Sequence, residues 1–155
     1  AMICKPRLLI ADEPTTALDV TIEAQILQLM QQLSRETGTS ILLISHNLGV
    51  IAELCDRVYV MYAGKIVEQA DVFTLFERHA HPYTGGLMAS VIDMAKQPRR
   101  LPAIGGVVPN LLHLPKGCAF APRCPRATER CREERPELTE LDTGHLCRCW
   151  NKEDQ

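Results

Sequence analysis

Short apolar runs alternate with amphipathic stretches in the amino-terminal half of the chain. The apolar runs predict buried strands at residues 8–11, 40–45 and 57–62. Between them, apolar residues recur at three- and four-residue steps over residues 21–35 and 48–55, which predicts helices. Strands that alternate with helices are typical of an α/β fold, so we expect a parallel sheet with flanking helices.

The pattern changes after the third predicted strand. Only Ala63 and Gly64 separate that strand from residues 65–69, so a terminal β-hairpin is predicted. Residues 71–79 predict a short amphipathic helix, which the sequence His81-Pro82-Tyr83-Thr84 interrupts. A further helix is predicted over residues 84–94.

The remainder of the chain is poor in periodic apolar patterns. Residues 97–117 are rich in Pro and Gly and predict an extended linker. A cysteine-rich tail follows it. We therefore expect an α/β domain over residues 1–80 and a small, loop-rich, cysteine-rich extension over residues 81–155.

The amino-acid composition of the chain limits the kinds of molecule that it is expected to bind. The chain has 155 residues, 46% of them hydrophobic, so a packed core is expected. The formal net charge is −2, from 17 basic and 19 acidic residues, which argues against a nucleic-acid partner. No apolar run reaches the length of a membrane span, and no secretory signal pattern is present.

The cysteines are unevenly distributed. Cys4 and Cys55 stand alone among apolar residues and are interpreted as small core side chains. The uneven spacing marks the tail as a second unit with its own chemistry. The tail cysteines are Cys118, Cys124, Cys131, Cys147 and Cys149.

The first strand runs directly into two acids, Asp12 and Glu13, which Pro14 follows. Ligands of open α/β sheets bind at the carboxyl ends of the strands. Two adjacent carboxylates are costly there unless a cation or a proton-transfer role compensates them. A magnesium nucleotide supplies both. The alternative is a strand end followed by an acidic helix N-cap.

Several segments resemble ATP-binding-cassette (ABC) ATPases. The stretch LLIADEPTTALD resembles the Walker B motif and D-loop, although the D-loop usually reads SALD and here reads TALD. The stretch SILLISHN resembles the H-loop. Two further stretches, ERHAHPYTGGLMAS and GCAFAPRCPRATERC, together with the ending from Gly144 to Cys149, resemble the carboxyl-terminal extension of the oligopeptide/dipeptide importers.

The resemblance implies a role for four residues of the α/β part. Asp12 would bind Mg²⁺ through water, and Glu13 would act as the general base or water-orienting residue for attack on the γ-phosphate of ATP. His46 would contact the γ-phosphate, and Asp19 would contact a partner subunit. The alternative for His46 is a helix N-cap or a hydrogen-bonded histidine, and the alternative for Asp19 is a helix N-cap. For Asp19 both interpretations can hold together.

The resemblance also implies a setting. The family's subunit pairs with a sister ATP-binding subunit and docks on two membrane-spanning permease subunits. A periplasmic or lipid-anchored substrate-binding protein delivers oligopeptides, dipeptides or nickel. The expected location is peripheral, at the cytoplasmic face of the inner membrane.

The printed sequence contains no phosphate loop of the form G-x-x-x-x-G-K-[ST] and no LSGGQ-type signature. We therefore expect the carboxyl-terminal portion of such a subunit, which on its own does not hydrolyse ATP. The alternative from another class is a non-catalytic iron–sulfur or zinc module with a regulatory or assembly role.

The tail spacing is Cys118-x5-Cys124-x6-Cys131-x17-Cys149. Four cysteines can ligate a [4Fe–4S] cluster or tetrahedral zinc, although zinc sites usually have tighter C-x2-C pairs. The resemblance implies a [4Fe–4S] cluster on these four residues. Zinc, free thiols or disulfides remain alternatives, and Cys147 is an alternative to Cys149 as the fourth ligand.

For other polar residues of the extension we expect simpler roles. Four arginines lie among the thiols and could offset the charge of a thiolate-bound cluster. We expect His79, His81 and His145 to be solvent-exposed loop histidines. The four arginines are Arg123, Arg126, Arg130 and Arg132.

Overall fold

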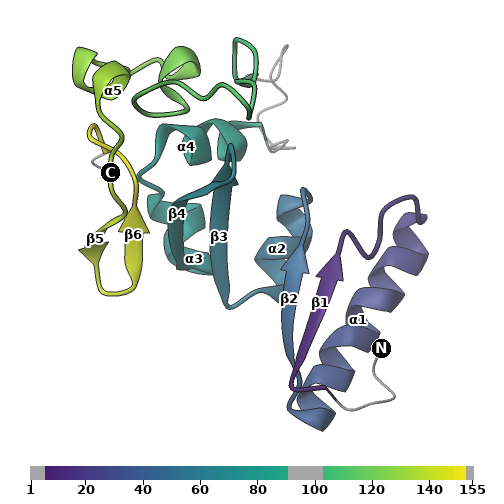
Figure 1. Ribbon diagram of the computed structural model, residues 1–155. Helices are drawn as coiled ribbons and strands as arrows, with labels where there is room; N and C mark the ends of the chain where they lie inside the picture. The colour runs from purple at the N-terminus through teal and green to yellow at the C-terminus, as the bar shows by residue number, and fades with distance from the viewer. Residues whose placement is uncertain (1–5, 91–102, 153–155) are drawn as a thin grey trace. The chain divides into compact units, whose positions relative to one another are not determined.

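The computed structural model describes residues 6–90 and 103–152 of the chain (Figure 1). It has mixed α/β structure and separates into two compact units, Ala1–Cys55 and Asp56–Gln155. Each unit is described below by itself.

The first unit contains parallel strands and helices in alternation. Strand β1 (Leu8–Asp12) is followed by helix α1 (Val20–Thr37), strand β2 (Ser40–Ile44) and helix α2 (Leu48–Leu54). The strands pair in parallel, in register from Leu8 opposite Ser40 to Asp12 opposite Ile44. The predicted strands and helices of this part are therefore confirmed, with ends shifted by a few residues.

Local sequence explains the ends of helix α1. The carboxylate of Asp19 accepts hydrogen bonds from the backbone N–H groups of Thr21 and Ile22, at 3.1 and 3.0 Å, and so caps the first turn. At the other end Gly38 takes a left-handed conformation with φ of 67°, which glycine adopts without steric cost. In the same way, Asn47 caps helix α2.

The two faces of the β1–β2 sheet differ in exposure. Ala11, on one face, is buried together with Leu27 of α1 and Val50 of α2. The opposite face leaves apolar side chains open to solvent, with exposed fractions between 45% and 61%. These exposed side chains are Leu8, Ile10, Leu42 and Ile44.

The second unit is built on an antiparallel sheet. Strands β3 (Arg57–Tyr62) and β4 (Lys65–Asp71) form the predicted hairpin, whose turn residues Ala63 and Gly64 have φ of 46° and 75°. Two strands of the extension, β5 (Thr139–Asp142) and β6 (His145–Cys147), complete a sheet of order β3-β4-β6-β5.

Strand β3 was predicted as the third strand of the sheet. Within the second unit it pairs antiparallel with β4, because the two-residue turn reverses the chain. The extension was predicted to be loop-rich, and its short strand β6 also pairs with β4 of the hairpin. Residues on both sides of the expected boundary at residue 80 therefore share one sheet.

Short helices complete the second unit. They are α3 (Val72–Arg78), α4 (Pro82–Ala89) and α5 (Glu129–Glu133), with a 3₁₀ turn η2 at Ala121–Arg123. Helix α4 begins two residues earlier than predicted, because the His81 side chain accepts from the N–H of Tyr83 and Pro82 suits the first turn. The end predicted at Met94 lies outside the described residues.

Aromatic packing forms part of the core of this unit. The rings of Tyr62, Tyr83 and Phe120 lie within 4.8–5.4 Å of one another, centroid to centroid. The guanidinium of Arg123 donates hydrogen bonds to the carbonyls of Ile104 and Gly105 and so holds the segment around these two residues in place. The linker predicted over residues 97–117 has no helix or strand in its described part, residues 103–117. Among the described residues, no helix combines the length and apolar character needed to cross a membrane.

Candidate functional site

The acidic pair lies at the carboxyl end of strand β1. Asp12 is the last residue of the strand, and Glu13 follows it with its N–H donating to the carbonyl of Ile44 at 2.9 Å. Glu13 has φ of 43°, which is uncommon for a residue other than glycine. The backbone turns sharply at this point, and the Glu13 side chain leaves the strand end toward the next strand.

Glu13 and His46 form a contact between two strand ends. His46 Nδ1 lies 3.0 Å from Glu13 Oε1, and the hydroxyl of Thr16 donates to Glu13 Oε2 at 2.9 Å. The hydrogen bonds from His46 and from Thr16 lower the pKa of Glu13 below its ordinary value of 4.5. The side chains of His46 and Glu13 remain 80% and 45% exposed, so the pair is open to a ligand.

The structure therefore brings together two of the predicted residues and leaves a third beside them. Asp12 adjoins Glu13 in the chain and is exposed. Asp19 instead caps helix α1, as the helix-cap interpretation predicted. Thr16 was expected only as a departure in the D-loop, and its contact with the Glu13 carboxylate was missed.

This edge of the first unit can do two things chemically. An ionised carboxylate next to an imidazole can accept a proton from water and pass it on. A second exposed carboxylate can bind a hard cation such as Mg²⁺, directly or through water. The side chains of Asp12 and Glu13 are both exposed to solvent, so a ligand can reach them.

The second candidate site consists of four thiols of the extension. The side chains of Cys118, Cys124, Cys131 and Cys149 lie close enough to interact electrostatically. We call these four residues the thiol group. The backbone N–H of Cys118 donates to the carbonyl of Cys131 at 2.8 Å, which joins two of the four segments directly.

The surroundings of three of the four thiols, Cys118, Cys124 and Cys149, favour the protonated form. Burial raises the pKa of Cys149 to about 11, and the charges of the other three thiols act in the same direction. Burial also raises the pKa of Cys118 and Cys124.

The fit to a metal is incomplete. Within residues 6–90 and 103–152, no set of three or more His, Cys, Asp or Glu side chains is arranged to hold a metal ion. The four sulfurs share one region without forming a ligand cage. A cluster or zinc ion would need them to move together.

The arginines near the thiols differ from the expected set. Burial raises the pKa of Cys124 and of Cys118; the charge of Arg126 partly opposes this at Cys124, and that of Arg135, which was not predicted, at Cys118. The other three bind elsewhere: Arg123 to the carbonyls of Ile104 and Gly105, Arg130 to Glu134 and the ring of Trp150, and Arg132 to Glu129.

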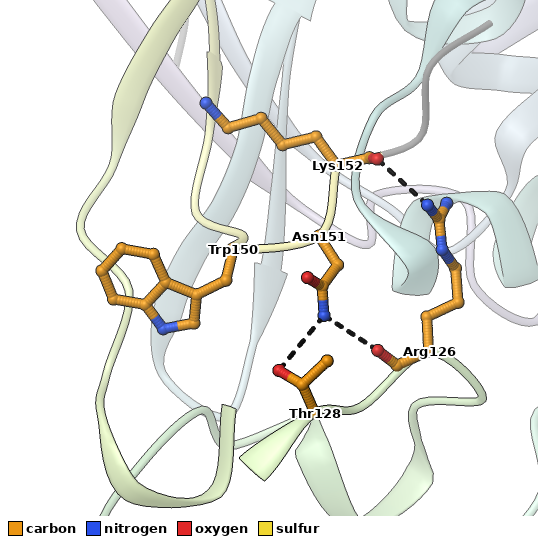
Figure 2. Close-up of a pocket in the computed structure, with 5 residues that line it drawn as sticks. All are labelled: Arg126, Thr128, Trp150, Asn151 and Lys152. Carbon is orange, nitrogen blue, oxygen red and sulfur yellow. Dashed lines mark hydrogen bonds between the residues drawn. The ribbon is translucent and has the colours of Figure 1, made fainter. Parts of the chain in front are cut away.

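Cys131 lies beside an open polar hollow of about 460 Å³. Asn151 donates to Cys131 Sγ at 3.4 Å, and Thr128 Oγ1 lies 3.3 Å from the same sulfur. Figure 2 shows Asn151 between Thr128 and the backbone of Arg126. The hollow is lined by Arg126, Thr128, Trp150, Asn151 and Lys152.

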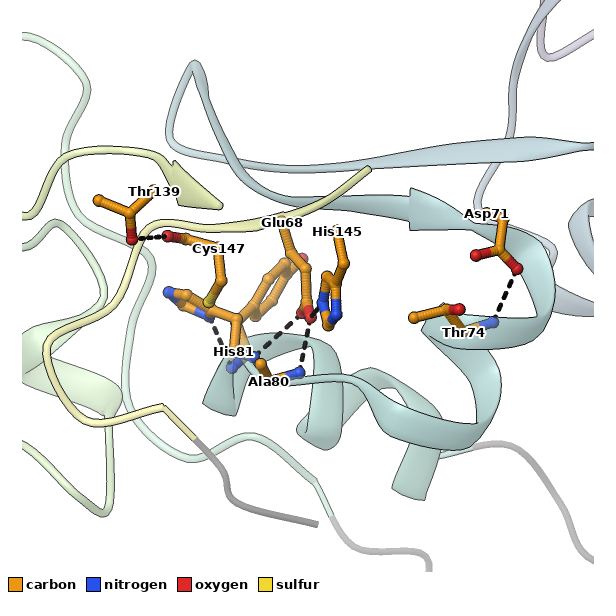
Figure 3. A network of polar contacts seen from close by, with 9 residues as sticks. Glu68, Asp71, Thr74, Ala80, His81, Thr139, His145 and Cys147 are labelled. Atoms are coloured by element: carbon orange, nitrogen blue, oxygen red, sulfur yellow. Dashed lines mark hydrogen bonds and ion pairs between the residues drawn. The ribbon is translucent and has the colours of Figure 1, made fainter. Parts of the chain in front are cut away.

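Sequence reasoning missed a buried polar network in the second unit (Figure 3). Glu68 is fully buried and accepts from the N–H groups of Ala80 and His81, at 2.6 and 3.0 Å, and its Oε1 lies 2.8 Å from His145 Nε2. Burial lowers the pKa of His81 to about 4. We call Glu68, His81 and His145 the Glu68 network.

The Glu68 network corrects the expectation for the histidines. His81 and His145 are buried, with exposed fractions of 1% and 6%, and His79 is half-buried. They are not exposed loop residues, because strand β6 covers Glu68 and the helix α3–α4 junction lies against it. The sequence did contain one indication of this network: Glu68 lies within the predicted hairpin strand 65–69, and an acid inside an apolar strand needs hydrogen-bond partners.

Comparison with known proteins identifies relatives of this chain. Residues 67–131 match the family described as the oligopeptide/dipeptide transporter, C-terminal region. A probable peptide ABC transporter ATP-binding protein of Sinorhizobium fredii is 56% identical over 155 residues, which cover 99% of this chain and 46% of that protein.

Two further relatives carry transport names. An oligopeptide transport ATP-binding protein of Haemophilus influenzae is 51% identical over 97% of this chain and 46% of its own length. A dipeptide transport ATP-binding protein of Escherichia coli is 46% identical over 96% of this chain and 46% of its own length. The chain thus spans about half the length of the curated relatives it matches.

The relatives define the class as ATP-binding proteins of ABC transporters. Within that class, the chain belongs to the oligopeptide/dipeptide transporter family, whose C-terminal region its residues 67–131 match.

Proposed function

We propose that the chain is the carboxyl-terminal part of an ATP-binding subunit that couples ATP hydrolysis to the import of oligopeptides or dipeptides, with nickel as the alternative cargo. The observation that supports this most is the contact between Glu13 and His46 at the carboxyl ends of two parallel strands. The names of the relatives support the peptide cargo.

The proposed roles follow from the chemistry of this edge. Asp12 would hold Mg²⁺ through water, and the metal would supply charge neutralisation for the phosphates. Glu13 orients or deprotonates the attacking water, and the hydrogen bonds that lower its pKa favour the ionised form. His46 holds Glu13 in place and contacts the γ-phosphate.

Asp19 has a proposed second role beside its structural one. Its carboxylate caps helix α1, while its exposed position leaves it open to a sister ATP-binding subunit. Two permease subunits and a substrate-binding protein complete the proposed transporter. The proposed location is peripheral, at the cytoplasmic face of the inner membrane.

The chain alone is proposed to be inactive. Phosphoryl transfer depends mainly on positioning and on stabilising charge, and a phosphate loop supplies the backbone cradle and the lysine. Neither is present in the printed sequence. The proposed division of labour places the ATPase residues in 1–80 and the importer-type extension in 81–155.

ATP hydrolysis by two proteins tests the proposal. The first is this chain, for which we expect background turnover. The second is a hybrid in which the unmatched part of the Haemophilus influenzae relative is joined to this chain. We expect the hybrid to hydrolyse ATP, and Glu13→Gln to remove hydrolysis by a factor of about 100 or more while ATP binding persists.

The matched control is Glu36→Gln, which changes an exposed carboxylate of helix α1 away from the strand ends. It should leave turnover within about twofold. A Glu13→Gln hybrid with normal turnover would contradict the role of Glu13. Robust turnover by the chain alone, lost in Glu13→Gln, would contradict its proposed inactivity.

A second candidate function concerns the thiol group. We propose that Cys118, Cys124, Cys131 and Cys149 hold a [4Fe–4S] cluster with a structural role, with zinc as the alternative. The mutual proximity of the thiols and the charge of Arg126 and Arg135 support it. A bound cation would offset the repulsion among thiolates, and a small extension gains stability from such a site.

Anaerobic purification tests this second candidate. Iron and sulfide at about four each per chain, with visible absorbance that Cys131→Ser removes, would support the cluster. Stoichiometric zinc without iron would replace it with the zinc alternative. Protein with neither, and with all thiols free, would contradict both.

A further inference from the structure

The thiol group draws its cysteines from two separate segments of the extension. Backbone hydrogen bonds connect Cys118, Cys124 and Cys131 within the first segment: Cys118 N–H donates to the Cys131 carbonyl at 2.8 Å, and two successive turns join Cys118 to Cys124 through Ala121. Cys149 comes later in the chain, after strands β5 and β6. A thiol site that includes Cys149 therefore needs a link between the two segments.

The side chain of Asn151 makes such a link. Its Nδ2 donates to the carbonyl of Arg126 at 2.9 Å and lies 3.5 Å from Thr128 Oγ1 (Figure 2). The same nitrogen donates to Cys131 Sγ at 3.4 Å. Because a carbonyl oxygen can only accept, Nδ2 and not Oδ1 must face Arg126. One N–H of the amide is thus directed to Arg126, and the other lies between the Thr128 hydroxyl and the Cys131 sulfur.

The backbone of Asn151 contacts a second thiol. Its N–H forms a hydrogen bond with the Cys149 sulfur. Burial raises the pKa of Cys149 to about 11, and this hydrogen bond partly opposes the rise. Asn151 therefore touches Cys131 through its side chain and Cys149 through its backbone, so one residue bridges thiols from both segments.

Two neighbouring contacts hold the same part of the chain without involving a thiol. The indole N–H of Trp150 donates to the carbonyl of Glu134 at 3.3 Å. The guanidinium of Arg126 donates to the carbonyl of Lys152 at 3.2 Å. Both contacts limit where the segment after β6 can lie, but each ends on a backbone carbonyl. Asn151 is the more specific link, because its own contacts end on sulfur atoms.

We propose that Asn151 is a positioning residue that holds Cys149 near Cys131 and so joins the two segments into one thiol site. Hydrogen bonds to the residues that bind a cation commonly orient those residues. The proposal rests on the thiol-site function proposed above, but it concerns the arrangement of the thiols in the metal-free chain. Its failure and the failure of the cluster proposal can therefore be told apart.

Crosslinking of the reduced, metal-free chain tests the proposal. A short bifunctional thiol reagent is added, and peptide mass spectrometry measures the Cys131–Cys149 crosslink relative to the Cys118–Cys131 crosslink. The second crosslink is the internal reference, because the backbone bond between Cys118 and Cys131 does not involve Asn151. Asn151→Leu keeps a branched side chain of similar size but has no donor. It should lower the ratio about fivefold, the factor expected from one hydrogen bond.

Two further variants separate the hydrogen bonds from packing. Asn110→Leu makes the same change at an exposed asparagine of the second unit, whose Oδ1 accepts from the N–H of Leu112 at 2.9 Å, and it should leave the ratio unchanged. Asn151→Gln keeps the amide and should retain at least about half of the original ratio. Far-ultraviolet circular dichroism shows whether each variant is folded.

A measurement on the unsubstituted chain carries the test if Asn151→Leu does not fold. The side-chain amide protons of Asn151 should exchange with water at least about tenfold more slowly than those of Asn110, because the Asn151 amide donates to partners in the fold. Nuclear magnetic resonance measures both rates in one sample.

Four results would overturn the proposal. The first is an unchanged crosslink ratio in folded Asn151→Leu, and the second is an equal fall in Asn110→Leu. The third is a ratio in Asn151→Gln as low as that in Asn151→Leu, which would assign the effect to packing. The fourth is side-chain amide exchange of Asn151 as fast as that of Asn110. Iron and sulfide contents do not enter any of these comparisons.

Discussion

His46 Nδ1 lies 3.0 Å from Glu13 Oε1, although 33 positions separate the two residues in the chain. The parallel register of β1 and β2 accounts for this. Asp12 lies opposite Ile44, so the residues that follow the two strands emerge side by side at one edge. Neither side chain is buried, and the contact is therefore held by backbone geometry and by hydrogen bonds.

The titration of Glu13 should report this contact. Because the hydrogen bonds from His46 and Thr16 favour the ionised form, the midpoint should lie below the ordinary value of 4.5. His46→Ala should raise it, and Thr16→Val should raise it less. Carbon-13 NMR of the Glu13 carboxyl measures the midpoint.

The lowered pKa of Glu13 also determines how the stability of the folded state depends on pH. A lowered carboxyl pKa stabilises the folded state above pH 4.5, and this contribution disappears as the pH falls through the lower folded-state pKa. A midpoint for Glu13 that does not move in His46→Ala would show that the contact is absent in solution.

The cap of helix α1 gives a second expectation. Asp19→Ala leaves the N–H groups of Thr21 and Ile22 without their acceptor, so the first unit should lose about 1 kcal/mol of stability. Asp19→Asn keeps an acceptor oxygen and should lose only a few tenths, about the spread among good caps. Urea unfolding followed by far-ultraviolet circular dichroism measures both, and equal losses would argue against the cap.

The buried His81 should make the second unit sensitive to acid. Burial lowers its pKa from 6.5 to about 4, so the unfolded chain binds a proton between these values and the folded chain does not. Stability should be unaffected by this residue above pH 6.5. It should fall as the pH drops from 6.5 to 4, by up to about 3 kcal/mol, and then level off.

His81→Asn provides the comparison for that expectation. It cannot titrate, so the pH dependence of unfolding between pH 6.5 and 4 should become shallower, whatever its effect on stability at pH 7. Denaturant unfolding at several pH values measures the slope. Parallel slopes in the two proteins would mean that His81 is not the responsible group.

Gly117 is expected to tolerate no side chain. A Cβ atom there would lie 2.3 Å from the carbonyl oxygen of Cys131 and 2.6 Å from backbone atoms of Arg132. Gly117→Ala should therefore destabilise the second unit by about 1–3 kcal/mol or more, and separate Cys118 from Cys131. Gly105→Ala is the matched control, since no atom lies within 4 Å of its Cβ position. Urea midpoints that agree for the two variants would contradict the close approach.

The first unit was predictable because its signals are local. Apolar runs of strand length, a helix N-cap residue at Asp19 and a glycine at position 38 are all signals carried by neighbouring residues of the sequence. The meeting of Glu13 and His46 then follows, because parallel strands bring their carboxyl ends together. The role of Thr16 was not predictable, since it depends on the turn made by a residue with positive φ.

The second unit was predictable in its hairpin and in helices α3 and α4, but not in its two later strands. Strands β5 and β6 have 4 and 3 residues, too few to display an alternating pattern. The burial of Glu68 depends on His145, which lies 77 positions further along the chain. A local pattern cannot specify a contact of that separation.

The bare face of the β1–β2 sheet leads to the last prediction. Leu8, Ile10, Leu42 and Ile44 expose 52%, 61%, 45% and 46% of their surface, whereas parallel sheets are ordinarily covered on both faces. Such a patch should bind apolar dyes and promote association of the chain with itself.

A double variant, Ile10→Lys with Leu42→Lys, should reduce dye fluorescence and shift the chain toward the monomer in analytical ultracentrifugation. Because Ile10 and Leu42 are 61% and 45% exposed, the stability of the first unit should change by less than about 0.5 kcal/mol per substitution. Ala11→Lys on the covered face is the contrasting variant and should unfold the unit, since Ala11 is only 8% exposed. Unchanged dye binding in the double variant would mean that another segment already covers this face.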